Sequence, residues 1–414
     1  MNEGKSFQIS QKAVLDAYKL VKSNKGAGGV DGTTLDDYEK DLKNNLYKLW
    51  NRMTSGSYFP KAVRGVEIPK KNGNKRLLGI PTIEDRVAQM VTRMVLEPNV
   101  EKFFLDDSYG YRPNRSAIDA IRVTRERCWE YGWVLEFDIV GLFDNIDHNL
   151  LMKAVRTHTN EKWVILYIER FLKASMVMPD GSIQERRAGT PQGGVISPIL
   201  ANLFMHYTFD KWIRRTFPNN PWVRYADDGI VHCVSEKQAK YLLYKLKERM
   251  NLCGLAIHPD KTRIVYCRSD RFRGTHENTS FDFLGYTFRT RYVKSKNGNF
   301  FNAFTPAVSN EASKKFRSKI KDIRMNSKTC SIERLAELMN PIIRGWMNYF
   351  MMFGSREARK SLDYINTTLV KFVHRKYKRK GTSMGKAWRF LGRWAKSNPT
   401  LFYHWKKGIV LTIG

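Results

Sequence analysis

The sequence predicts an α+β fold in which strands in the middle of the chain precede an all-helical end. Apolar residues alternate in 64–82 and again in 134–140, as they do in half-buried strands. Residues 83–105 and 236–252 instead repeat their apolar positions with the period of a helix. Strands grouped apart from helices are typical of the α+β class. Helical periodicity returns at the end of the chain in residues 314–325, 332–353 and 356–380.

The elements before the first central strand are also predicted individually. Residues 10–58 are expected to form helices that are interrupted at the glycine-rich stretch 26–32. Residues 64–82 are expected to form a hairpin. Asp147 is a candidate N-cap of a following helix, and for that reason it is not counted as a metal ligand. The helix 83–105 is expected to bury a stripe formed by Ile83, Val87, Met90, Val91 and Met94.

Two adjacent carboxylates are the most informative feature of the chain. Asp227 and Asp228 lie between the short apolar segments 222–224 and 229–231, so they are expected at the tip of a hairpin. A third carboxylate, Asp138, precedes them by about 90 residues. It alternates with the apolar residues of 134–140 and should point to the opposite face of that strand.

Three carboxylates gathered across neighbouring strands repel one another unless cations lie between them. Oxygen ligands select hard cations such as Mg²⁺. This arrangement is typical of a phosphoryl-transfer site in which two ions, roughly 3.5 to 4 Å apart, hold the attacking and leaving oxygens. The sequence therefore predicts a site for two Mg²⁺ ions.

An Asp-Asp pair alone is weak evidence, because most such pairs are solvated turn residues. Three further features strengthen it: Asp138, Phe143 five positions later, and the turn sequence Gly189–Gly194. With these residues the chain resembles reverse transcriptases, and among them the group II intron-encoded, or maturase, type.

Further motifs of that family follow in order along nearly the whole chain. Ser108–Ser116 resembles a signature of group II-type enzymes, and Phe283–Tyr286 is similar to their primer-grip segment. The other matching segments are Asn24–Gly32, Arg64–Thr82 with Asp85–Gln89, and Asn340–Phe350, which resembles the maturase-specific thumb, also called domain X.

The resemblance implies a right-hand polymerase with fingers, a ferredoxin-like palm and a helical thumb. It places a reverse transcriptase domain in residues 1–300, which comprises the N-terminal extension, fingers and palm. The thumb, or domain X, is expected in 301–380. A basic nucleic-acid-binding segment is expected in 381–414.

The implied reaction is attack of a primer 3′-hydroxyl on the α-phosphate of a deoxynucleoside triphosphate. Asp138 and Asp227 are implied to bridge both ions, with Asp228 as the third catalytic carboxylate. The backbone carbonyl of Ile139 is implied to complete the ion on the nucleotide side. Nucleotide contacts are implied for five further residues. Lys70 and Arg76, in the fingers, would hold the triphosphate, and Lys261 would face the pyrophosphate. Gln192 would lie against the nascent base pair, and Phe143 against the sugar 2′ position.

The charge of the chain supports nucleic acid as a partner. Its formal net charge is +32, and the fraction of hydrophobic residues, 42%, allows a large core. Residues 301–414 hold 24 Lys+Arg against 6 Asp+Glu. An anionic membrane is the second option, but residues 381–383 and 397–399 interrupt any long amphipathic helix. The aromatic residues of this region either stack on bases or form the core of a small helical subdomain. Candidate nucleic-acid contacts are Arg112, Arg344, Arg375, Lys376, Lys378, Arg379 and Lys380.

The implied partners are the group II intron RNA, an RNA template with a DNA primer, target DNA and deoxynucleoside triphosphates, with no membrane. The oligomeric state stays open, a dimer being one option. Five scattered cysteines without a C-x-x-C pair favour a reduced, intracellular protein and argue against a zinc site. The resemblance implies a bacterial, cytoplasmic protein associated with nucleoid or ribonucleoprotein. Many relatives continue into a Cys-rich endonuclease, so the end at Gly414 suggests the endonuclease-lacking form.

Two other functions remain open. One is an RNA-binding splicing cofactor without polymerase activity. The other is a domesticated relative that works in DNA repair, defence or CRISPR adaptation. The intact residues Asp138, Phe143, Asp227 and Asp228 argue against a decayed polymerase site.

Overall fold

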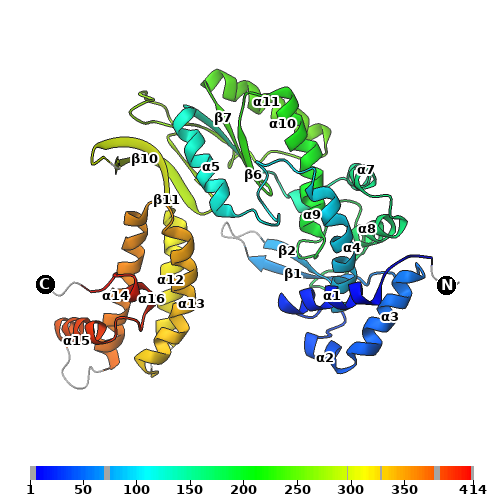
Figure 1. The fold of residues 1–414 in the computed structure, drawn as a ribbon, viewed down its shortest axis with the longest axis horizontal. Coiled ribbons are helices and arrows are strands. Elements are labelled where there is room, and N and C mark those ends of the chain that lie inside the picture. The colour runs from blue at the N-terminus through cyan, green and yellow to red at the C-terminus, as the bar shows by residue number, and fades with distance from the viewer. Residues whose placement is uncertain (1–5, 70–74, 296, 327–328, 377–382, 412–414) are drawn as a thin grey trace. The chain divides into compact units, whose positions relative to one another are not determined.

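The computed structural model describes residues 6–69, 75–295, 297–326, 329–376 and 383–411 (Figure 1). The chain divides into two compact units, each described by itself below. The first comprises residues 1–116 and 135–263, and the second comprises residues 117–134 and 264–414.

The first unit begins with the predicted helices. They are α1 (Gln11–Ser23), α2 (Leu35–Lys40) and α3 (Leu42–Thr54). The side chain of Thr34 caps α2 in a capping box with Asp37, which explains why the chain resumes a helix after the glycine-rich stretch. A further break at Asp41, which the sequence analysis did not predict, separates α2 from α3.

Helix α4 (Ile83–Glu101) packs against α1 and forms the centre of this part of the unit. Four residues of the predicted stripe are buried, and the fifth, Met94, is half-buried. The helix begins at Thr82, whose side chain accepts a hydrogen bond from the backbone N–H of Asp85. It ends four residues earlier than predicted.

The predicted hairpin of residues 64–82 is also present. Strands β1 (Val63–Pro69) and β2 (Lys75–Ile80) pair antiparallel, with Arg64 opposite Ile80. The short strands β4 (Met176–Val177) and β5 (Ile183–Gln184) extend this sheet, and β1 runs parallel to β4.

A second sheet in the first unit contains the strands that carry the aspartates. Strand β7 (Asp228–Cys233) lies between β6 (Trp222–Tyr225) and β3 (Trp133–Phe137). Asp147 caps α7 through a hydrogen bond from Leu150 N, as predicted. The remaining helices are α6 (Leu142–Asn145), α7 (His148–His158), α8 (Lys162–Lys173), α9 (Ser197–Met205), the π-helix η1 (His206–Asp210), α10 (Lys211–Thr216) and α11 (Glu236–Leu252).

The second unit joins a small sheet to a group of helices. Strand β10 (Tyr286–Lys294) lies between β9 (Ser280–Phe283) and β11 (Phe300–Val308), and helix α5 (Ala117–Glu130) packs against β11. Strand β8 (Arg263–Tyr266) starts at the boundary of the units. The helices are α12 (Asn310–Asn326), α13 (Ile332–Phe350), α14 (Ser355–Lys376), α15 (Met384–Ser397) and α16 (Tyr403–Lys406).

The helices of the second unit share one hydrophobic core, which continues from α12 to beyond α16. Leu391, Phe402 and Trp405 belong to it together with residues of α13 and α14. Trp388 and Trp394 are half-buried against this core, whereas Phe390 is 40% exposed. Packing therefore accounts for most of these aromatic residues, which the sequence left open between core and base stacking.

Two predictions about the whole chain can be compared with the structure. The five cysteines, all within the described ranges, form no disulfide. Among the described residues, no helix combines the length and the apolar character needed to cross a membrane.

A buried histidine makes the stability of the second unit sensitive to acid. Asn366 Oδ1 accepts hydrogen bonds from His404 Nε2 at 2.9 Å and from Trp405 Nε1 at 2.8 Å. Burial lowers the pKa of His404 to about 3. Below about pH 6.5 the unfolded chain takes up a proton that the folded protein cannot accept, so stability falls as the pH falls.

We therefore expect the second unit to be on the order of 2 kcal/mol less stable at pH 5 than at pH 7 because of His404. His404→Gln, which can still donate to Asn366, should flatten this dependence. Thermal melting of both proteins between pH 5 and 7 measures it, and an equally steep dependence in the variant would remove His404 as the cause.

Candidate active site

The predicted hairpin presents the adjacent aspartates. Strands β6 and β7 pair antiparallel, with Tyr225 opposite Asp228, so Ala226 and Asp227 form the turn. Ala226 has a φ of 58°, in the left-handed region. For a residue with a β-carbon this conformation costs on the order of 1–3 kcal/mol. The surrounding structure must therefore hold the turn in place.

Asp138 reaches the hairpin because β3 lies against β7. The ring of Phe137, the last residue of β3, packs over Gly229, where any β-carbon would overlap with the ring. Asp138 follows directly and is 7% exposed. Its backbone oxygen accepts a hydrogen bond from His258 N at 2.8 Å, which fixes the chain just beyond the strand.

The charge of Asp138 acts on both aspartates of the turn. Burial, the charges of Asp227 and Asp138, and a hydrogen bond with Asp138 raise the pKa of Asp228 to about 7. Burial also raises the pKa of Asp227, and the charge of Asp138 adds to this effect. The cluster therefore binds a proton in the pH range where isolated aspartates are ionised.

Lys261 lies beside this cluster. Its Nζ is 2.6 Å from Asp138 Oδ2, and its side chain is 61% exposed. The hydrogen bond to Asp138 raises the pKa of Lys261. The implied role of Lys261 was a contact with pyrophosphate, whereas in this structure it partly neutralises the carboxylates.

The oxygen atoms available at the site are of the kind that binds a hard cation. It consists of the carboxylates of Asp138, Asp227 and Asp228, with the carbonyl of Ile139 next in the chain. Within the described part of the chain, however, no three His, Cys, Asp or Glu side chains are arranged closely enough to enclose a metal ion. The raised pKa of Asp228 shows that the carboxylates nevertheless interact. A cation would thus have to draw them together and release Lys261.

A series of hydrogen bonds runs from the β1–β2 hairpin through Gln192 to Asp144, the residue after Phe143. Arg76 Nε donates to Gln192 Oε1, and Gln192 Nε2 donates to Asp144 Oδ2 at 3.0 Å. Arg76 also lies close enough to Asp227 to lower its pKa against the effect of burial. Two of the candidate nucleotide contacts, Arg76 and Gln192, are thus brought together next to the carboxylates, while Lys70 lies outside the described residues.

The rings of Phe143 and Tyr111 contact each other, and Tyr111 lies near Asp227. Phe143 is 9% exposed, and its ring centroid is 6.5 Å from that of Tyr111 in an edge-to-face contact. Tyr111 is 49% exposed and also lies 6.4 Å from the ring of Tyr225. Burial and the charge of Asp227 raise the pKa of Tyr111. The sequence analysis did not single out Tyr111, although it lies within the signature Ser108–Ser116.

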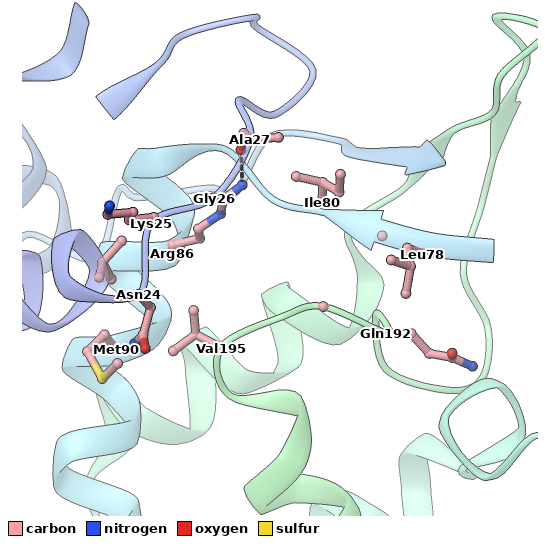
Figure 2. A pocket seen from close by; sticks show the side chains of 13 residues that line it. Asn24, Lys25, Gly26, Ala27, Leu78, Ile80, Arg86, Met90, Gln192 and Val195 are labelled. Carbon is pink, nitrogen blue, oxygen red and sulfur yellow. Dashed lines mark hydrogen bonds between the residues drawn. The ribbon is translucent and has the colours of Figure 1, made fainter. Parts of the chain in front are cut away.

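A cavity of about 280 Å³ adjoins Gln192 (Figure 2). The glycine-rich loop before α2, strand β2, helix α4 and the turn after Gln192 line it. Arg86 fixes the loop, because its Nη2 donates to Ala27 O and its Nε donates to Pro81 O at 3.1 Å. The motif near the N-terminus and the turn Gly189–Gly194 therefore meet in space.

The candidate nucleic-acid contacts differ in how far they are exposed to solvent. Arg112 is largely buried: its side chain is only 4% exposed and donates to Glu101, Leu105 O and Ser108 O, so in this structure its donors are used within the protein. Arg344 is exposed over the ring of Tyr403. Arg375 and Lys376 are exposed at the end of α14, and Lys378, Arg379 and Lys380 lie outside the described residues.

Comparison with protein families gives two matches. Residues 68–288 match the family described as reverse transcriptase (RNA-dependent DNA polymerase). Residues 313–394 match the maturase-specific domain of group II introns.

Individual relatives agree with these matches. Protein YkfC of Escherichia coli K12 is 32% identical over 67% of this chain and 81% of its own length. Group II intron-encoded protein LtrA of Lactococcus lactis subsp. cremoris is 36% identical over 48% of this chain, which spans about 33% of LtrA. A solved structure of telomerase from Candida albicans matches 91% of this chain and 68% of its own chain, with 13% identity and a TM-score of 0.47.

The contact between Phe137 and Gly229 gives a direct test of how the site is assembled. Gly229→Ala should cost about 1–3 kcal/mol of unfolding free energy, because the new methyl group must displace the ring. Phe137→Leu should restore part of this loss in the double variant. Thermal melting measures both, and a Gly229→Ala protein as stable as the wild type would mean that β3 does not pack this closely on β7.

Proposed function

This chain belongs to the reverse transcriptases and carries the maturase-specific domain of group II intron proteins, and from that premise we propose that it copies RNA into DNA and helps its intron RNA to splice. The observation that carries the polymerase part is the group of three interacting carboxylates at the strained turn. Asp138 is buried and Asp227 and Asp228 are half-buried, so their mutual repulsion disfavours a purely structural role, whereas polyphosphate chemistry uses such a group of carboxylates to hold cations.

We assign the reaction to the three aspartates. Asp138 and Asp227 would hold two Mg²⁺ ions jointly, Asp228 would support the ion nearer the primer, and the carbonyl of Ile139 would complete the other. Bound there, the cations would supply charge neutralisation for the phosphate and activation of the primer 3′-hydroxyl. The protein itself contributes position, because the fixed backbone of β3 and of the turn keeps the carboxylates in place.

The surrounding side chains would bind and orient the nucleotide. Arg76 presents a planar guanidinium suited to phosphate oxygens, and its bond to Gln192 holds both residues against the site. Gln192 would lie against the nascent base pair and Phe143 against the sugar. Lys261, released from Asp138, would be free to face the pyrophosphate.

In this proposal the architecture is that of a right hand. The hairpin of β1 and β2 with α4 would form the fingers, strands β3, β6 and β7 the palm, and helices α12, α13 and α14 the thumb. The boundaries at residues 300 and 380 remain part of the proposal, and the hydrophobic core of the helices continues past residue 380. The excess of basic residues after residue 300 supports intron RNA as the partner of this region.

Asp227→Asn should abolish template-dependent DNA synthesis on RNA in Mg²⁺. The substitution removes one charge while leaving the shape of the side chain almost intact, so folding and RNA binding should persist. Primer extension measures the activity, with RNA affinity as the control. Extension at a rate near that of the wild type would disprove the assignment.

Phe143→Ala should raise the use of ribonucleotides relative to deoxyribonucleotides roughly tenfold or more, because it removes a steric clash at the 2′ position. Single-nucleotide addition with matched ribo- and deoxyribonucleoside triphosphates measures this ratio. Unchanged discrimination would assign Phe143 to the core alone.

Neutralising Arg375, Lys376, Lys378, Arg379 and Lys380 together should weaken intron RNA binding and splicing more than primer extension. Each lost phosphate contact should reduce the slope of log affinity against log salt by roughly 0.7 to 0.9. RNA binding at several salt concentrations, splicing, and extension of a pre-annealed primer measure the three effects. The converse variant, Asp227→Asn, should splice but not polymerise. Equal loss of splicing and extension in the neutralised variant would contradict this division of roles.

A further inference from the structure

A buried ion pair lies directly beneath the turn that carries the catalytic aspartates. Arg224, the residue before Tyr225, and Asp210 are both fully buried. Arg224 Nε donates to Asp210 Oδ1 and Arg224 Nη2 donates to Asp210 Oδ2, each at 2.7 Å. The pair therefore has the two-point geometry that fixes a guanidinium in both position and orientation.

The remaining donors of Arg224 reach the turn and the chain that packs on it. Nη1 donates to the backbone oxygen of Ala226 at 3.0 Å and to Asn202 Oδ1 at 3.2 Å. Nη2 also donates to Ser108 Oγ at 2.8 Å. Ala226 is the residue with the left-handed φ of 58°. The side chain of Arg224 therefore holds the strained residue through its backbone oxygen.

The segment Ser108–Gly110 closes over the turn from another direction. Tyr109 N donates to Arg224 O at 2.9 Å, and Asn202 Nδ2 donates to Gly110 O at 2.6 Å. A β-carbon at Gly110 would lie 2.6 Å from Ala226 N, so only glycine allows this approach. Asn202 thus connects Arg224 to the same segment.

Asp210 owes its position to an irregular helix. The π-helix η1 lies between α9 and α10, and it ends at Asp210. A π-type turn contains one extra residue, which rotates the following residues by about 100° relative to a continuous α-helix. Arg249 supports the widened turn by donating to Thr208 O and Tyr207 O, both at 2.9 Å.

We propose that Arg224 and Asp210 are positioning residues for the polymerase reaction, which hold the Ala226 carbonyl and thereby set the carboxylates of Asp227 and Asp228. A buried ion pair adds little net stability compared with apolar residues of the same size, because both charges lose their hydration. What the ion pair contributes is a fixed position for the backbone of the turn. This inference rests on the proposed polymerase function.

The double variant Arg224→Met/Asp210→Leu separates positioning from folding. It replaces both charges by apolar side chains and leaves neither charge buried alone, so it should remain folded and bind primer–template with an unchanged Kd. The turn loses its hydrogen bonds, so the rate of single-nucleotide addition at saturating nucleotide should fall about 100-fold. A folded double variant that adds nucleotides at the wild-type rate would overturn the inference.

Backbone hydrogen exchange at residues 225–229 gives a readout that needs no activity. These amides should exchange faster in the double variant and in Arg224→Lys, which keeps a charge beside Asp210 but lacks the second nitrogen that reaches Ala226. The control Arg291→Met/Glu357→Leu alters a more exposed arginine–glutamate pair of the second unit, 3.4 Å apart, and should leave exchange at the turn unchanged.

If the double variant does not fold, Arg224→Lys decides through the same two measurements. Wild-type exchange and a wild-type rate in Arg224→Lys would then contradict the inference. A wild-type protein that adds no nucleotides at all would instead refute the proposed function. In that case exchange at the turn alone would still show whether Arg224 holds it.

Discussion

The close approach of three carboxylates is the constraint that determines how the residues around the candidate active site are arranged. Asp138 comes from the end of β3, and Asp227 and Asp228 come from the turn between β6 and β7. They interact because the ring of Phe137 packs on Gly229. Burial and mutual repulsion raise the pKa of Asp228 to about 7, so the folded protein keeps acidic groups together at an energetic cost. Lys261 and Arg76 offset only part of that cost, which is why a cation is the natural complement of the site.

Much of this site could be predicted from the sequence because its signals are local. Asp227 and Asp228 stand between two apolar segments, and Asp138 interrupts the alternation of another. Arg224 and Asp210 could not be predicted, since a charged residue in a sequence suggests exposure and no periodicity reveals a π-helix. Arg112 was assigned to nucleic acid from its motif, and nothing in the sequence indicated that Glu101 and backbone oxygens would accept its hydrogen bonds. The ion pair between Lys261 and Asp138 depends on a separation of 123 residues, which spacing alone cannot predict.

The two RNA roles rest on different physical features of the chain. Polymerisation depends on fixed geometry, and the residues that provide it are buried or hydrogen-bonded to one another. In our proposal, intron binding would depend on charge, which is concentrated after residue 300 and exposed at positions such as Arg344 and Arg375. Trp388 and Trp394 pack against the helical core, so the aromatic residues there mainly support the surface that carries this charge. We therefore expect that substitution can remove one role without removing the other.

The most direct measurement of the central claim is the effect of Mg²⁺ on thermal melting of the protein without nucleic acid or nucleotide. A ligand that binds only the folded state raises the melting temperature by an amount that grows with its concentration relative to its Kd. If the crowded carboxylates form the cation site, Mg²⁺ should stabilise the wild type and should stabilise Asp138→Asn much less. An equal rise in both proteins, or no rise in the wild type, would contradict the account.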